Sequence, residues 1–170
     1  MVNASATITA SNVFTQSHAN VYNLINDRTN VPDPNDSSGA RKFVYVREPL
    51  SMGRGFKGYP AIIVQPVDYD QGDDPKTVSG TKNVTGFEIK IIVWSQDRHS
   101  DSDGNSTGRA TLDSISDSIA ATLNANKTTL RNWGMKKLRI DTNTSYTEDN
   151  GKAIFGREFT LIFTQLGCIV

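Results

Sequence analysis

The chain has 170 residues, 36% of them hydrophobic, which is enough for one compact domain with its own core and short for two. Lys plus Arg and Asp plus Glu both total 18, so the formal net charge is zero. A neutral chain lacks the general basic field that gathers phosphate backbones, which argues against sequence-independent nucleic-acid binding. The single cysteine, Cys168, excludes an intrachain disulfide.

The first residues lack both the cationic segment and the continuous apolar stretch of a secretory signal. No later run approaches the roughly 18 apolar residues of a membrane helix. We therefore expect a protein that is made and kept in the cytosol, with no membrane partner.

Residues 11–27 carry apolar side chains at spacings near three, four and seven, which is typical of one face of a helix. Ser11 can cap this helix, because its hydroxyl accepts a backbone N–H at the N-terminus. We expect the buried face to comprise Val13, Phe14, Val21, Leu24 and Ile25.

Two short strands are expected next, over residues 43–47 and 61–67. Proline, glycine and short polar residues dominate residues 28–42 and 49–60, so both segments are predicted to be long loops, the second of them mobile. Pro66 has no N–H to donate, which places its end of the strand at an edge of the sheet or outside it.

Residues 87–95 alternate as a strand, between predicted loops near residues 68–83 and 96–108. Ile92 and Trp94 make both faces apolar at the far end, so this end of the strand should be central in the sheet. One face is formed by Phe87, Ile89, Ile91 and Val93, and the other begins with Glu88 and Lys90.

A second helix is predicted over residues 109–126, with Thr107 as its cap. Its buried face should consist of Leu112, Ile115, Ile119, Ala120 and Leu123. Residues 135–144 and 154–165 then read as strands, and the Asn-Gly pair at 150–151 predicts an antiparallel hairpin between them.

This order of elements predicts one α/β (α+β) domain over residues 1–170. We expect a mixed sheet of about five strands, because a strand, helix, strand crossover lies in the middle of the chain. The two helices are expected to pack on one face of that sheet.

The chain contains no strong catalytic, cofactor or metal signature. Asp101, Asp103 and Asn105 match the first, third and fifth positions of a calcium loop, but Ser106 and Leu112 stand where Gly and Glu are needed. A loop leading into the second helix is the better interpretation.

His18 and His99 are far apart in sequence, and no patterned nucleophile or carboxylate accompanies them. We therefore expect no enzyme activity, no cofactor and no metal.

Two loops are candidates for contact with other proteins. Arg54, Phe56 and Lys57 could contact a protein or line a channel, because two cations flank an aromatic side chain in a glycine-rich loop. The longer loop before the central strand exceeds the two to five residues that join adjacent strands, and long loops tend to be functional or disordered. Its candidate contact residues are Asp68, Asp70, Asp73, Asp74, Lys76 and Lys82.

The segments "GYPAIIVQPVDYDQ", "TGFEIKIIVWSQD" and "RATLDSISDSIAATLNAN", followed by the hairpin "MKKLRIDTNTSYTEDNGKAIFGREFTLIFTQL", resemble the tail terminator, or tail-completion, proteins of long-tailed bacteriophages and related viruses. The resemblance extends over residues 11–166. It implies a virion neck protein that assembles as a ring, usually a homohexamer. Such a ring caps the head-proximal end of the tail tube and stops its polymerisation.

The partners implied by this resemblance are further copies of the chain, the tail tube protein, and a head–tail connector or head-completion protein. DNA is implied only in passage through the channel. Another neck or head-completion protein of a tailed virus is an alternative. A small ligand-binding domain or enzyme without a recognisable motif, and an adaptor that binds a peptide along an exposed strand, are alternatives from other classes.

Overall fold

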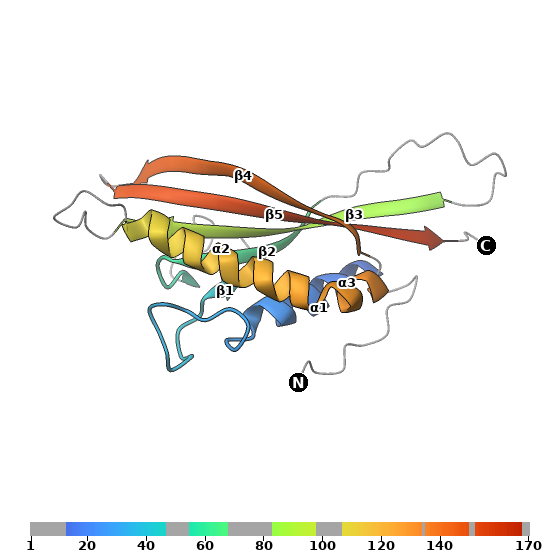
Figure 1. The fold of residues 1–170 in the computed structure, drawn as a ribbon, viewed down its shortest axis with the longest axis horizontal. Coiled ribbons are helices and arrows are strands. Elements are labelled where there is room, and N and C mark those ends of the chain that lie inside the picture. The colour runs from blue at the N-terminus through green and yellow to red at the C-terminus, as the bar shows by residue number, and fades with distance from the viewer. Residues whose placement is uncertain are drawn as a thin grey trace.

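A computed structural model describes residues 13–46, 55–67, 83–97, 107–133, 135–149 and 152–167. These residues form an α+β fold with one five-stranded sheet (Figure 1), as the sequence predicted. The elements are α1 (Val13–Asn26), β1 (Val44–Tyr45), β2 (Ala61–Val67), β3 (Asn83–Gln96), α2 (Thr107–Ala125), α3 (Lys127–Asn132), β4 (Met135–Asp149) and β5 (Lys152–Gly167).

The strand order in the sheet is β1-β2-β3-β5-β4. β1 and β2 are parallel, whereas the pairs β2–β3, β3–β5 and β4–β5 are antiparallel, so the sheet is mixed. The predicted antiparallel hairpin is therefore confirmed. The three helices lie on one side of the sheet, with α2 crossing its middle strands (Figure 1).

The main hydrophobic core lies between the helices and the sheet. Alternation along β3 directs Ile89, Ile91 and Val93 toward the helices, and all three are fully buried. The residues expected to cover the sheet are also buried: Val21, Leu24, Ile115, Ile119 and Leu123.

The helix-free face of the sheet is also partly apolar. Ile92 and Trp94 alternate with the core-facing residues of β3 and therefore lie on this face. Ile63 of β2 and Ile154 of β5 are buried there too. The prediction that the far end of β3 is central is confirmed, since β2 and β5 flank it on both sides.

Several predicted ends of strands were wrong. β1 covers only two residues instead of 43–47, although the carbonyl of Phe43 still accepts the N–H of Ile62 at 3.0 Å. β3, β4 and β5 are longer than predicted, because the antiparallel ladder continues through polar residues whose pattern does not mark a strand. The expectation for Pro66 is confirmed. β1 pairs only with Ile62 and Ile63 of β2, so at Pro66 the strand β2 has β3 as its one described neighbour and lies at an edge of the described sheet.

The helices also differ from the prediction at their ends. α2 already includes Thr107, and the carboxylate of Asp97 accepts the N–H of Gly108 at 2.6 Å. A Cβ at Gly108 would lie 2.7 Å from the backbone nitrogen of Asp97, so only glycine fits at this close approach. α3 was not predicted; it follows α2 after Asn126 and buries Leu130 in the core.

Gly156 provides a test of the packing on the helix-free face. A Cβ at Gly156 would lie 2.7 Å from Cζ3 of Trp94, the residue opposite it on β3. We expect Gly156→Ala to lower the free energy of unfolding by about 1–3 kcal/mol, because the indole ring must shift. Urea unfolding followed by tryptophan fluorescence measures this loss.

Gly55→Ala is the matched control, since no atom lies within 4 Å of a Cβ at Gly55. In a Trp94→Leu background the Gly156→Ala substitution should become nearly neutral. An equal cost in both backgrounds would contradict the packing of Trp94 on Gly156.

Candidate functional site

The structure describes only part of the predicted contact residues. Phe56 and Lys57 lie within the described segment that precedes β2. The rest fall outside the described residues: Arg54, Asp68, Asp70, Asp73, Asp74, Lys76 and Lys82. Asp101, Asp103 and Asn105, the partial calcium pattern, and His99 also fall outside them.

Phe56 belongs to a small aromatic group beside β1. Its ring lies 5.8 Å from the ring of Tyr45 and 5.0 Å from that of Tyr59, the second pair in an edge-to-face arrangement. The Tyr45 hydroxyl donates to the carbonyl of Lys42 at 2.8 Å and accepts the N–H of Lys57 at 3.1 Å. Tyr45 thus joins the predicted contact loop to the strand β1.

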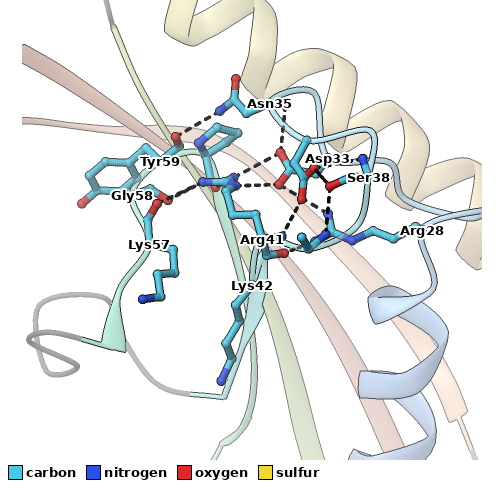
Figure 2. Close-up of polar contacts among 12 residues, drawn as sticks. Arg28, Asp33, Asn35, Ser38, Arg41, Lys42, Lys57, Gly58 and Tyr59 are labelled. Atoms are coloured by element: carbon cyan, nitrogen blue, oxygen red, sulfur yellow. Dashed lines mark hydrogen bonds and ion pairs between the residues drawn. The ribbon is translucent and has the colours of Figure 1, made fainter.

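Arg41 holds the same loop from the other side (Figure 2). Its Nη1 donates to the carbonyl of Gly58 at 3.0 Å, and its Nη2 donates to the carbonyl of Pro60 at 2.6 Å. A planar guanidinium can reach several acceptors at once because its N–H groups have a fixed geometry. These hydrogen bonds join the described part of the glycine-rich loop to the neighbouring loop.

The charge of Arg41 is matched by a buried carboxylate. Arg41 Nε donates to Asp33 Oδ2 at 2.6 Å, and Arg41 Nη2 donates to Asp33 Oδ1 at 3.1 Å. The side chain of Asp33 is fully buried, so this bidentate pair is removed from solvent. Asp33 Oδ1 also accepts the N–H of Asn35 at 2.9 Å, and the Asn35 amide donates to the carbonyl of Tyr59 at 3.2 Å.

A second arginine completes this cluster. Arg28 Nη1 lies 3.4 Å from Asp33 Oδ2, and Arg28 Nη2 donates to the carbonyl of Arg41. Both guanidiniums lie over the ring of Phe43, at 4.9 Å for Arg28 and 5.5 Å for Arg41. We call Arg28, Asp33, Arg41 and Phe43 the arginine clamp.

Asp36 orders the turn that leads to the clamp. Its carboxylate accepts the Ser38 hydroxyl at 2.5 Å and the N–H of Arg41 at 2.5 Å. The Ser38 hydroxyl bond, the Arg41 N–H bond and the nearby charge of Arg28 stabilise the ionised form and lower the pKa of Asp36 to about 2. The loop of residues 28–42 has no regular helix or strand, as predicted, and charged hydrogen bonds hold it in place.

The clamp leaves little capacity for a ligand. The donors of Arg41 are directed to Asp33 and to backbone carbonyls, and Arg28 bonds within the same cluster. The described hydrogen bonds of both guanidiniums go to acceptors within the cluster, whereas Arg28 Nη1 is buried, makes no hydrogen bond and has only its 3.4 Å ion-pair contact with Asp33. The hydrogen bonds of the arginine clamp therefore link the loop of residues 28–42 to the loop that precedes β2.

Two polar side chains of α1 satisfy carbonyls along the β1–β2 edge. His18 Nε2 lies 2.9 Å from the carbonyl of Val64, which can only accept, so Nε2 carries the proton. The Tyr22 hydroxyl donates to the carbonyl of Val44 at 3.3 Å, and burial, together with Tyr45, raises the pKa of Tyr22. His18 thus links α1 to the backbone of β2.

The helix-free face carries one charged pair in its centre. Lys90 Nζ lies 2.9 Å from Glu158 Oε1, which also accepts the hydroxyl of Thr160 at 3.1 Å. Lys137 and Arg139 of β4 are exposed and occupy positions opposite β5. This face therefore carries an apolar part around Ile92 and Trp94 and a charged part around Lys90, Glu158, Lys137 and Arg139.

Within the described ranges, no group of three or more His, Cys, Asp or Glu side chains is placed to hold a metal ion. None of the helices in the same ranges has both the length and the apolar character needed to cross a membrane. Comparison with known protein families gave no match, and a search of curated proteins found no relative.

The arginine clamp can be tested by removing its central residue. Arg41→Ala leaves the buried carboxylate of Asp33 with the longer contact to Arg28 as its charged partner and the N–H of Asn35 as its hydrogen-bond donor, so we expect a loss of about 3 kcal/mol in the free energy of unfolding. Chemical denaturation measures this value. The exposed Lys57→Ala substitution in the adjoining loop is the control and should change stability by less than about 0.5 kcal/mol.

The double variant Asp33→Asn/Arg41→Ala separates charge burial from lost packing. It should recover part of the loss, since it no longer buries a carboxylate. A double variant less stable than Arg41→Ala would contradict this explanation.

Proposed function

We propose that this protein is a structural component of a virus tail, which forms a ring at the head-proximal end of the tail tube. The ring stops polymerisation of the tube and joins the tail to the head connector. The observation that carries the proposal is the order of elements: a first helix, three strands, the helix α2 followed by the short α3, and a long closing hairpin. This is the order that the resemblance to tail terminator proteins implies.

The pairing of charges in the described residues supports a structural role over a ligand-binding one. The arginines of the clamp bond to Asp33 and to backbone carbonyls, and Lys90 pairs with Glu158. A ligand site is expected to hold polar groups that converge on an open pocket. Another neck or head-completion protein remains the second candidate within the same class.

The proposal places the protein in the virion neck, with assembly in the host cytoplasm. Its partners are then further copies of itself, the tail tube protein, and the connector or head-completion protein, while DNA passes through the channel. Zero net charge is compatible with this arrangement, because neighbouring copies do not repel each other strongly through their overall charge.

The first test is the assembly state. We expect a closed ring of identical subunits, because a head-to-tail interface forms a closed assembly only when its rotation fits a ring. Native mass measurement and negative-stain images of the purified protein, alone and on tail tubes, test this. A protein that stays monomeric in both settings would overturn the proposal.

The second test concerns the predicted contact loop of residues 68–82. Shortening residues 71–80 to a tight turn should leave the thermal midpoint unchanged, since loop closure depends only weakly on length. Tube capping or joining to the head should fail, because the candidate contact residues Asp73, Asp74 and Lys76 are lost.

A variant in which residues 71–80 are replaced by a Gly/Ser segment of equal length separates loss of length from loss of contacts. It should fail in the same way as the shortened variant. Normal yields of infectious particles from both variants would show that this loop has no part in joining.

A further inference from the structure

The charges of this neutral chain are unevenly distributed along its sequence. Residues 118–140 contain no Asp or Glu, yet they hold five basic side chains: Lys127, Arg131, Lys136, Lys137 and Arg139. Because the formal net charge is zero, the carboxylates that balance this basic segment lie elsewhere on the same chain. A basic segment of this kind is a candidate surface for an acidic partner.

Two of these cations lie on the exposed side of α3. This helix buries Leu130 in the core, whereas Lys127 and Arg131 are exposed. The two cations are four residues apart, so their Cβ atoms lie about 6 Å apart on one side of the helix, where like charges repel each other. Neither cation is in an ion pair with another described residue. The pair therefore lacks a counter-charge within the described part of the chain.

The exposed side of α2 carries the opposite charge at the same spacing. Asp113 and Asp117 are four residues apart, and the side chain of Asp113 is 48% exposed although its Oδ1 accepts a hydrogen bond from Arg157. Asp117 is exposed and has no ion pair with another described residue. Ser114 and Ala121 are exposed beside it, so no long side chain blocks the approach of a second helix.

We propose that α3 of one copy docks on the exposed side of α2 in the next copy, so that Lys127 and Arg131 face Asp117 and Asp113. The inference rests on the proposed ring, and it names the residues through which one subunit contacts the next. The contact joins two different surfaces of the chain, which is the head-to-tail kind that can close a ring. Its opposite charges steer the subunits together and fix the register of the two helices.

The two helices do not make this contact within one chain. α3 follows α2 directly after Asn126 (Figure 1). Asp117 and Lys127 are therefore about 15 Å apart along the helix direction, at about 1.5 Å per helical residue. An ion pair requires a separation of about 4 Å or less. A carboxylate from the middle of α2 thus reaches α3 only from another copy.

Duplex DNA is another polyanion that a basic segment can bind. A contact between copies is favoured, because the matching carboxylates are present on the same chain and at the same spacing as the cations of α3. A surface for DNA would also use Lys137 and Arg139, since phosphate contacts depend on charge rather than on one matching partner. The two explanations therefore differ in which variants have an effect.

Charge reversal on either helix tests the contact. We expect Lys127→Glu/Arg131→Glu to raise the concentration for half-assembly of the ring at least about tenfold, because repulsion replaces attraction at each contact. Asp117→Lys should act in the same direction for the same reason. Lys137→Glu/Arg139→Glu is the matched control, since it changes the net charge by the same amount on β4, and it should assemble as the unchanged protein does.

Mixing the α3 variant with the α2 variant separates the contact from a general effect of charge. At a concentration where neither variant assembles alone, an equal mixture should form rings in which the two proteins alternate, because the new carboxylates of one meet the new lysine of the other. Native mass spectrometry counts the copies of each protein in the ring. The thermal midpoints of the dissociated subunits should agree within about 4 °C, since exposed substitutions change stability little.

Rings of unchanged stability from Lys127→Glu/Arg131→Glu would overturn the inference and leave the proposed ring intact. Loss of assembly in both reversed proteins without recovery in the mixture would overturn it too. If the isolated subunit binds a short DNA duplex, and the α3 and β4 variants both lose this binding while their rings are unchanged, the basic segment serves DNA instead. If the unchanged protein forms no ring at any concentration, the proposed function fails and this inference fails with it.

Discussion

The pairing of β3 with β5 is the interaction on which the rest of the fold depends. β3 is paired along its whole length, from Asn83 to Gln96, with β5. β2 then adds to the free side of β3 and β4 to the free side of β5, while α2 packs across both central strands. Loss of this ladder would separate the two halves of the sheet and open the core beneath α2.

This ladder also constrains both faces of the sheet at once. On the helix side it requires an unbroken apolar row in each strand, such as Ile89 and Ile91 opposite Leu161 and Phe159. On the helix-free side it brings Trp94 over Gly156. A substitution that shifts the backbone of either strand therefore disturbs packing on both faces of the sheet, because the same two strands contribute side chains to each face.

Much of this architecture could be predicted from the sequence because it depends on local periodicity. The alternation around Ile91 marked the central strand, and the stripe around Ile119 marked the second helix. The short helix α3 was missed, since two threonines and only one core residue, Leu130, give it no helical pattern. The length of β1 was overestimated. How far this strand extends depends on its pairing with β2, and its own composition does not show where that pairing ends.

The arginine clamp could not be predicted from the sequence at all. Its acceptors include the carbonyls of Gly58 and Pro60, and a backbone carbonyl has no sequence signature. The parallel pairing of β1 with β2 brings the two loops together, so the contact exists only after the sheet has formed. In the fold, the carbonyls of Gly58 and Pro60 in the second loop both accept hydrogen bonds from Arg41.

The unequal edges of the sheet bear on the symmetry of any assembly. A contact in which β4 meets β4 would be isologous and would end at a dimer, with Lys137 and Arg139 of both copies on one continuous sheet face. A ring requires two different surfaces on each subunit, so that each copy can use one surface against the next. Among the described residues, the arginine clamp joins the loops beside β1, and β4 forms the opposite edge of the sheet with β5 as its described neighbour. The two edges of the described sheet therefore differ, and a head-to-tail contact is one that joins two different surfaces.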